Sequence, residues 1–323
     1  MTTAPEAAGR RLPFGLTGGQ FQLQEYTLFG VVILLIIAGT ILEPDVFPTS
    51  DNILNVLRQS STIGVLAIGM TFVIATGGID LSVGSMVAAA AVVGGQFADS
   101  GSVAFLLGAF GMGILLGGIN AGLIAYGKLV PFIATLAMFA IARGLALWIS
   151  DKTPISIFDL SGVRWFGTGE VIGIPSAVIV FLVVAVGGWI LLNRTSYGRH
   201  VVAVGGNREA ARIAGVKVSR IIFSVYVISG ICVAIAAILV SGRLSSASPV
   251  IGTLYELDTI AAVVIGGTAL AGGRATIVGT VLGVLTFALI FNLMTLMDLA
   301  VEIQQVSKGV IIIAAVLFQR KQS

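Results

Sequence analysis

The sequence predicts an all-α protein that crosses a membrane several times, and three observations support this fold class. First, 57% of its 323 residues are hydrophobic, 10% are charged, and the mean hydropathy is +1.05. A soluble domain carries roughly 25% charged residues. Second, apolar runs long enough to cross the hydrocarbon core as a helix, which takes about 20 residues, recur along the chain. Third, glycine is frequent, with 42 residues, as in helices that pack closely in lipid.

Ten apolar runs are predicted to be membrane-spanning helices. They cover residues 27–43, 61–76, 82–98, 103–126, 131–149, 175–193, 221–241, 257–270, 276–296 and 303–319. The second and eighth runs are short and interrupted by glycine, so their limits are the least defined. The chain is therefore divided into a polar N-terminal segment at residues 1–26, one transmembrane domain at residues 27–319 and a short tail at residues 320–323.

The basic residues predict which side of the membrane each loop faces, because lysine and arginine are retained in cytoplasmic loops. With ten spans, twelve lysines and arginines fall on one set of loops and only four on the opposite set, which carries most of the acids. Both termini and residues 194–220 are thus expected in the cytoplasm, and residues 44–60 and 150–174 outside. A short helix capped by Ser50 or Asp51 is expected at residues 50–59. The net charge of +3 follows from this topology and does not indicate nucleic-acid binding.

A glycine break with one carboxylate follows the second run, where residues 69–84 read GMTFVIATGGIDLSVG. An ionisable residue among membrane segments is costly and marks a polar path or a deliberate helix end. A glycine break lets the backbone leave the helix where protein or water satisfies it. Two interpretations of Asp80 are therefore open. It lines the path of a solute, or it caps a helix that starts near Leu81, assisted by Ser82.

Polar side chains and glycines within the apolar runs are the candidate path residues. They are Thr76, Gly77, Gly78, Asp80, Ser82, Asn120, Thr135 and Asn292. Arg143, in the fifth run, has no obvious partner in the sequence. Two interpretations are open: its side chain extends to the membrane surface, or it pairs with a carboxylate from another helix.

An internal similarity links this break to a later segment. Residues 266–273, GGTALAGG, resemble residues 77–84, GGIDLSVG, and both follow a short apolar run and precede another. Duplicated halves are common in transporters, with the path at their interface. Glycine-rich apolar sequences also match by chance, so duplicated halves are one of two open interpretations.

The basic loop at residues 194–220 is predicted to contain a short capped helix. Its N-cap is an asparagine, a glutamate in the first turn favours the helix dipole, and a glycine ends it. Such a short helix is not stable alone, and its two alanines are expected to fit a groove on a soluble partner. The alternative is an ordinary basic loop. The candidate docking residues are Asn207, Glu209, Ala210, Ala211, Arg212 and Gly215.

Several blocks of the chain resemble the permease subunits of ribose-type ABC sugar importers. They are residues 61–88, 120–136 and 197–215, with a looser fourth block at residues 265–273. Residues 209–215, EAARIAG, also match the Glu-Ala-Ala-x-x-x-Gly element with which ABC permeases form a coupling helix on their ATPase. The Ile-x-Leu-Pro that follows this element in the wider family is absent, and Val-Ser-Arg-Ile stands at residues 218–221 instead.

The resemblance implies a dimeric pore of ten-helix subunits in a bacterial inner membrane. The implied partners are a second permease copy or a paralogue, a periplasmic sugar-binding protein outside and a cytoplasmic ABC ATPase inside. The implied substrate is an uncharged pentose, hexose or related polyol. The chain itself is expected to be no enzyme and to hold no cofactor, because ATP and Mg²⁺ would bind the ATPase.

Two other function classes are weighed against this one. An ion- or proton-coupled secondary transporter of a small polar solute needs membrane-embedded acids for its coupling ion, and Asp80 is the candidate. A membrane enzyme needs a nucleophile–base pair or a set of metal ligands. The sequence has one histidine, His200, and one cysteine, Cys232, which disfavours the enzyme.

Overall fold

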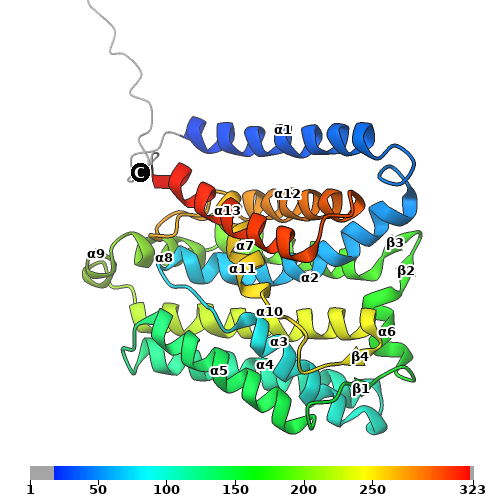
Figure 1. Cartoon of the computed structure of the whole chain (residues 1–323). Helices are drawn as coiled ribbons and strands as arrows, with labels where there is room; N and C mark the ends of the chain where they lie inside the picture. The colour runs from blue at the N-terminus through cyan, green and yellow to red at the C-terminus, as the bar shows by residue number, and fades with distance from the viewer. Residues whose placement is uncertain (1–17, 321–323) are drawn as a thin grey trace, which may run out of the picture.

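A computed structural model describes residues 18–320, and these form a bundle of helices with short strands at one end (Figure 1). The first half contains α1 (Gly18–Leu42), α2 (Ser50–Ala75), α3 (Val83–Gln96), the 3₁₀ turn η1 (Ala98–Ser100), α4 (Ser102–Ala125), α5 (Pro131–Ile149), β1 (Ile155–Ser156), α6 (Ser161–Thr168), β2 (Glu170–Val171) and β3 (Ile174–Pro175). The second half contains α7 (Ser176–Asn193), α8 (Ser196–Gly206), α9 (Arg208–Ile213), α10 (Val218–Leu244), β4 (Ser246–Ala247), α11 (Tyr255–Ile265), α12 (Ile277–Leu296) and α13 (Val301–Arg320).

The predicted all-α polytopic fold is confirmed, and each of the ten predicted runs falls on one helix. Among the described residues, seven helices are long and apolar enough to cross a membrane: α1, α2, α4, α5, α7, α10 and α12. The runs at residues 82–98 and 257–270 correspond to the shorter helices α3 and α11, with 14 and 11 residues. The last run corresponds to α13, which begins with a polar turn. Ten crossings therefore remain a prediction.

The second helix is longer than the sequence predicted. α2 runs without interruption from Ser50 to Ala75, so the separate helix expected at residues 50–59 was wrong. Its cap is Thr49, whose hydroxyl accepts the backbone N–H of Asn52 at 3.4 Å, and not Ser50 or Asp51. The polar stretch stays helical because no glycine or proline separates it from the apolar run, and the hydroxyls of Ser60 and Ser61 donate to the carbonyl of Leu57, at 3.1 and 2.6 Å.

The centre of the bundle is formed by α2, α3 and α10. The residues of α3 are mostly alanine, valine and glycine, and nearly all are buried. Small side chains let neighbouring backbones approach closely, which is how membrane helices gain packing energy without a hydrophobic driving force. The same device joins α4 and α10, where a Cβ at Gly117 would lie 2.8 Å from the Cα of Gly230.

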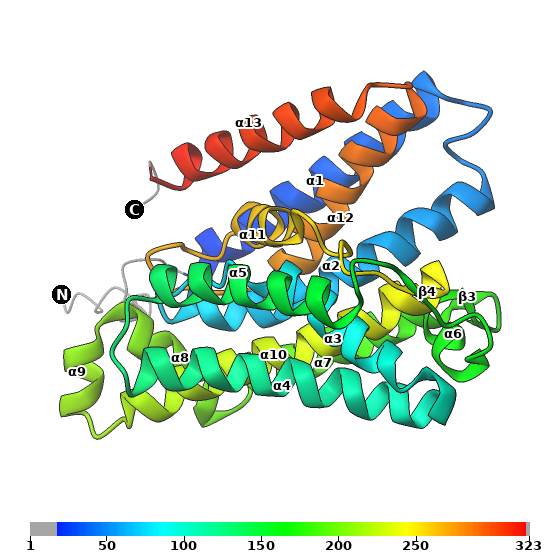
Figure 2. The same ribbon diagram turned by 60° about the horizontal axis from the view of Figure 1, so that its bottom comes forward.

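The molecule has two distinct ends. α8 and α9 lie at one end, and α6 with the strand pairs β1–β4 and β2–β3 lies at the other (Figures 1 and 2). The start of α1 and the end of α13 both lie on the same side of the molecule as α9 (Figure 2). The loop expected outside the membrane at residues 150–174 contains β1, α6 and β2, and β3 begins at its end.

Candidate functional site

The glycine break ends α2 through a helix-terminating turn. Gly77 has a φ of +76°, its N–H donates to Ile74 O at 2.8 Å, and the N–H of Gly78 donates to Val73 O at 3.2 Å. This is the Schellman pattern, which satisfies the last carbonyls of a helix. The left-handed conformation at Gly77 favours glycine, so the glycine pair fixes where the chain leaves α2.

Asp80 is the centre of a buried polar cluster after this turn. Its Oδ1 accepts the backbone N–H of Ser82 at 3.0 Å and the Ser82 hydroxyl at 2.5 Å. Its Oδ2 accepts the hydroxyl of Ser229, on α10, at 3.1 Å. The amide of Asn120, on α4, donates to Ser82 Oγ at 2.9 Å. All four side chains are shielded from solvent, so the cluster ties the break to two neighbouring helices.

The role of Asp80 at the helix start differs from the expected cap. α3 starts at Val83, two residues later than expected, and its N-cap Ser82 makes no side-chain cap bond. Asp80 instead bonds the backbone two residues ahead, as in an Asx-turn. It therefore shapes the approach to α3 while also contacting α10, a link that the local sequence could not indicate.

The other candidate path residues divide into two groups. Thr135, on α5, reaches the break, since its hydroxyl lies 3.2 Å from Ile79 O. Thr76 keeps its hydroxyl on Val73 O, at 2.8 Å. Asn292 lies elsewhere: it exchanges amide hydrogen bonds of 3.1 and 2.7 Å with Asn52, in the first turn of α2. The structure thus separates Asn292 from the break by most of the length of α2.

The internal similarity is reproduced as matching backbone geometry. After α11, Gly267 has a φ of +90°, and its N–H donates to Val264 O at 3.0 Å. The N–H of Thr268 donates to Val263 O at 3.2 Å. This is the turn that ends α2, repeated at the end of α11.

These two turns and the segment that connects α8 to α9 contact one another through backbone atoms. The N–H of Gly273 donates to Ala75 O at 3.0 Å. A Cβ at Gly272 would lie 2.7 Å from Gly77 N and 3.0 Å from Gly205 O. The guanidinium of Arg208 lies 3.4 Å from Thr76 O. We call this contact of three glycine segments, residues 75–78, 205–208 and 271–273, the glycine junction.

The predicted docking helix forms as α9, next to the glycine junction. The Asn207 side chain accepts the N–H of Ala210 at 2.9 Å, which confirms the predicted N-cap. Gly215, with a φ of +85°, ends the helix. The N–H of Val216 donates to Ala211 O at 3.0 Å, which completes a Schellman turn. The helix is thus built as expected, although the preceding helix α8 was not predicted.

The face that α9 presents differs from the expected one. Ala211 is only 5% exposed, because it packs against the chain itself, so it is not available to a partner. The exposed face contains Ala210 and Ile213, and the isoleucine is 78% exposed. Glu209 and Arg212 form an exposed ion pair at 2.6 Å, and the carboxylate raises the pKa of Arg212. Sequence reasoning missed Ile213, although a large apolar residue among charged ones was a signal.

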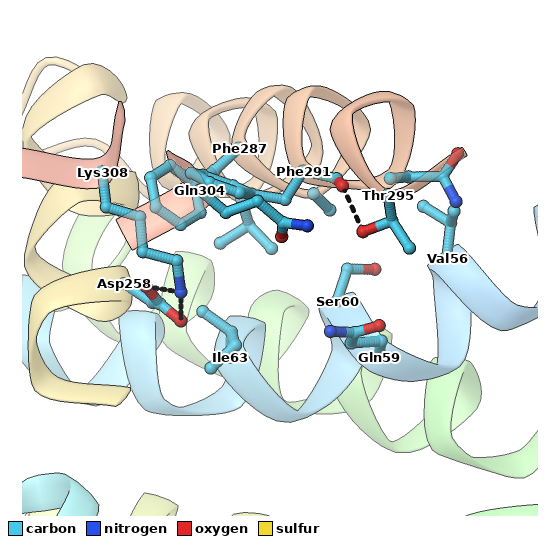
Figure 3. Close-up of a pocket in the computed structure, with 13 residues that line it drawn as sticks. Val56, Gln59, Ser60, Ile63, Asp258, Phe287, Phe291, Thr295, Gln304 and Lys308 are labelled. Atoms are coloured by element: carbon cyan, nitrogen blue, oxygen red, sulfur yellow. Dashed lines mark hydrogen bonds and ion pairs between the residues drawn. The ribbon is translucent and has the colours of Figure 1, made fainter. Parts of the chain in front are cut away.

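A separate cavity of about 190 Å³ lies between α2, α11, α12 and α13 (Figure 3). Lys308 reaches across it from α13 to Asp258 on α11, with Nζ 2.8 and 3.0 Å from the carboxylate oxygens. The wall also carries amides, hydroxyls and two phenylalanine rings. Its lining residues are Val56, Gln59, Ser60, Ile63, Asp258, Val284, Phe287, Ala288, Phe291, Asn292, Thr295, Gln304 and Lys308.

Arg143 finds its partners in the segment before α11. Its guanidinium donates to Pro249 O at 2.5 Å and to Ile251 O at 3.1 Å. These hydrogen bonds go to backbone carbonyls, and the predicted carboxylate is also present, because Glu256 on α11 interacts electrostatically with Arg143. The same segment brings Gly252 against Gly84, in the first turn of α3. The two short helices α3 and α11 therefore start beside each other.

Comparison with known proteins decides the family. The model of the family described as the branched-chain amino acid transport system / permease component matches residues 52–316. The chain belongs to this permease family. The match includes all four blocks on which the family resemblance rested, and that resemblance is confirmed.

The permease also has close relatives among characterised proteins. It is 45% identical over 305 residues to the ribose import permease protein RbsC of Bacillus subtilis (strain 168), which covers 93% of this chain and 94% of the relative. It is 38% identical to the D-allose transport system permease protein AlsC of Escherichia coli (strain K12), in a match that covers 91% of this chain and 90% of the relative. It is 31% identical to XylH, the xylose transport system permease of the same strain, over 91% of both chains. No solved structure matches the permease.

Proposed function

We propose that this permease is the membrane-spanning subunit of an ATP-binding-cassette importer that moves an uncharged sugar into the bacterial cytoplasm. The relatives' names include ribose, D-allose and xylose, which supports a pentose, hexose or related polyol as the substrate. The proposed partners are an ABC ATPase, a periplasmic sugar-binding protein and a second permease copy or paralogue in the inner membrane. The permease performs no catalysis, and ATP with Mg²⁺ is held by the ATPase.

The observation that carries this proposal is the connection between α9 and the glycine break. α9 is a short, doubly capped helix whose exposed side carries Ile213 and an ion pair. Arg208, at its start, lies 3.4 Å from the carbonyl of Thr76 at the end of α2. A soluble protein that moves α9 would therefore also displace the end of α2 and the turn after α11. An importer driven by a separate ATPase requires such a mechanical connection between its cytoplasmic surface and its membrane helices.

An uncharged substrate is supported by the state of two buried acids, Asp80 and Asp258. Asp80 accepts hydrogen bonds from Ser82 and Ser229, and Asp258 is paired with Lys308. Buried charges are costly unless they are paired or hydrogen-bonded, and these already have their partners. A secondary transporter would need an acid that is free to bind its coupling ion. In addition, such a transporter works without an ATPase, so α9 would have no partner to bind.

The proposed orientation in the membrane rests on the distribution of basic residues and on the positions of the first and last helices. The α9 end contains the basic loop at residues 194–220, and we propose that it faces the cytoplasm. The described chain starts and finishes at this same end (Figure 2), as an even number of crossings requires. Ten crossings with cytoplasmic termini fit both observations.

Reconstitution tests the proposed function. The permease is purified with its ATPase and its sugar-binding protein, placed in liposomes, and supplied with radiolabelled ribose, allose or xylose. Import of at least one sugar that requires ATP and all three components is expected. The permease alone, with a proton or sodium gradient, is the control. Import by the permease alone under that gradient would instead establish the secondary transporter.

A further inference from the structure

We infer that the cavity between α2, α11, α12 and α13 holds the sugar during transport. This inference rests on the proposed function and adds a binding site to it. The cavity is distinct from the Asp80 cluster: it is lined by Asn292 rather than by Asp80, Ser82 or Asn120. The cluster is shielded from solvent and its polar atoms mostly bind one another, whereas the cavity is an open space with polar groups directed into it.

The lining of the cavity has the chemistry that a sugar requires. Gln59 and Ser60 reach it from α2, Thr295 from α12 and Gln304 from α13 (Figure 3). Ser60, Thr295 and Gln304 each donate to a backbone carbonyl of the chain, at 3.1, 2.8 and 3.0 Å, so their oxygens remain as acceptors for the hydroxyl groups of a solute. The exposed Gln59 amide makes no side-chain hydrogen bond within the described residues. Ligand sites generally combine a few such groups with apolar walls.

Two aromatic rings supply the apolar wall. Phe287 and Phe291 lie one turn apart on α12, with ring centroids 4.5 Å apart and planes inclined by 52°. Aromatic side chains contribute a rigid apolar face, against which the C–H faces of a sugar ring can pack. The rings stand opposite the polar residues of α2 in the close-up (Figure 3). A sugar between them would contact rings on one side and amides or hydroxyls on the other.

The ion pair at the inner end favours a neutral ligand. Lys308 Nζ is 2.8 Å from Asp258 Oδ1, and it also lies 5.0 Å from the centre of the Phe291 ring. Each charge is thus already neutralised, and a charged ligand would have to displace its partner at considerable cost. A neutral hydroxyl can accept from the lysine or donate to the carboxylate without separating them.

The position of the cavity fits a transport site. It extends from Thr295, in the last turn of α12 and at the end opposite α9, to Asp258, in the first turn of α11. α11 starts beside the first turn of α3, inside the bundle. Transporter sites lie near the membrane midplane and at the ends of short, interrupted helices. On our orientation, the cavity leads from the outer end to that depth.

A neighbouring groove provides the matched control. On another side of α12, Leu285 and Leu289 line an apolar groove with residues of α1 and α2. Its surface is almost entirely apolar, so it suits lipid chains and not a sugar. Ala288 and Leu289 are adjacent in sequence, yet the first lines the cavity and the second lines the groove.

The first test fills each space in turn. Ala288→Trp should reduce ATP-driven sugar import at least tenfold in the reconstituted importer, because the indole occupies the cavity, while the ATPase still co-purifies. Leu289→Trp should retain import within about twofold. Equal import by the two variants would overturn the inference. If the unmodified importer moves no sugar at all, the proposed function fails instead.

The second test detects the sugar in the cavity directly. Cys232 is replaced by alanine, and Ala288→Cys is exposed to a membrane-impermeant thiol reagent in the assembled importer with and without the transported sugar. The sugar should slow modification at position 288 at least fivefold. Val103→Cys, at the exposed start of α4, controls for general effects and should react equally in both cases. Unchanged modification at position 288, or none in either case, would show that the sugar does not use this cavity.

Discussion

At the scale of single residues, Asp80 and Gly78 show that the glycine break is tightly packed and hydrogen-bonded. The carboxylate of Asp80 accepts hydrogen bonds from two serines that are far apart in sequence, Ser82 and Ser229. Gly78 faces the hydroxyl of Tyr226, which is buried. Each of these contacts is tight, so each substitution has a specific steric or polar consequence.

Asp80→Asn should be milder than Asp80→Leu. The asparagine carbonyl can still accept from Ser82, and its amide can donate to the Ser229 hydroxyl, which then reverses its role. Leucine leaves buried donors without partners, at a cost of about 1–3 kcal/mol each. Thermal unfolding in detergent should therefore show a near-normal Tm for the Asn variant and a clear loss for the Leu variant. Normal stability of the Asn variant together with abolished import would instead assign Asp80 a charge-dependent role in the path.

Gly78→Leu should abolish import while the chain still inserts in the membrane. A Cβ at this position would lie 2.6 Å from the Tyr226 hydroxyl, so the break has to move. Gly118→Leu is the matched control, because nothing lies within 4 Å of a Cβ at Gly118. Membrane content by immunoblot and sugar import in cells are the measurements. Near-normal import by Gly78→Leu would mean that the break has room to adjust.

At the scale of elements, the glycine junction joins the ends of α2 and α11 to α8 and α9. Because the contacts are between backbones, a side chain at Gly205, Gly272 or Gly273 would separate the segments. The sequence predicted each of these turns locally, since glycine at a helix end is typical of a left-handed terminating residue. It could not predict that they meet, because contacts between distant backbones leave no signature besides glycine itself.

Gly272→Ala should uncouple ATP hydrolysis from import. Gly272 has a φ of +84°, and an alanine Cβ would lie 2.7 Å from Gly77 N. Gly173→Ala is the control for backbone strain without a steric contact. Gly173 has a φ of +77°, but a Cβ added there would have nothing within 4 Å. The ratio of sugar imported to ATP hydrolysed should fall severalfold only for Gly272→Ala. A similar fall for both would assign the effect to backbone strain alone.

Ile213→Asp should release the ATPase from the permease. Burying an isoleucine side chain is worth about 1.5–3 kcal/mol, which corresponds to roughly 10- to 150-fold in affinity. Co-purification of the ATPase measures this loss. Ile172→Asp is the control, because Ile172 is 98% exposed and lies between β2 and β3, which are at the end opposite α9 (Figure 1). Undiminished recovery with Ile213→Asp would exclude this face of α9 as the docking surface. The earlier candidate Ala211 is unsuitable because it packs within the chain.

At the scale of the whole molecule, the sequence predicted well where helices lie along the chain, since each predicted apolar run falls on one helix. Each backbone polar group in lipid must be satisfied within its own segment, so a long apolar run has few alternatives to a helix. The start of α2 was wrong because no glycine or proline separates the polar stretch at residues 50–60 from the apolar run, so the helix continues through both. Asn292 was predicted as a path residue on residue type alone, and the sequence could not show that its partner is Asn52, 240 positions away. Such pairings depend on packing and not on local pattern.

The orientation of the whole molecule gives the last prediction. Ala214 and Asp159 are both exposed, the first directly after α9 and the second beside α6, so they lie at opposite ends. Cysteines at these positions, in a chain with Cys232 replaced, should react differently with an impermeant thiol reagent on intact cells. The charge asymmetry places Ala214 inside and Asp159 outside, so only Asp159→Cys should be modified until the membrane is opened. Modification of Ala214→Cys but not Asp159→Cys would reverse the orientation and place Ile213 beyond the reach of any cytoplasmic ATPase.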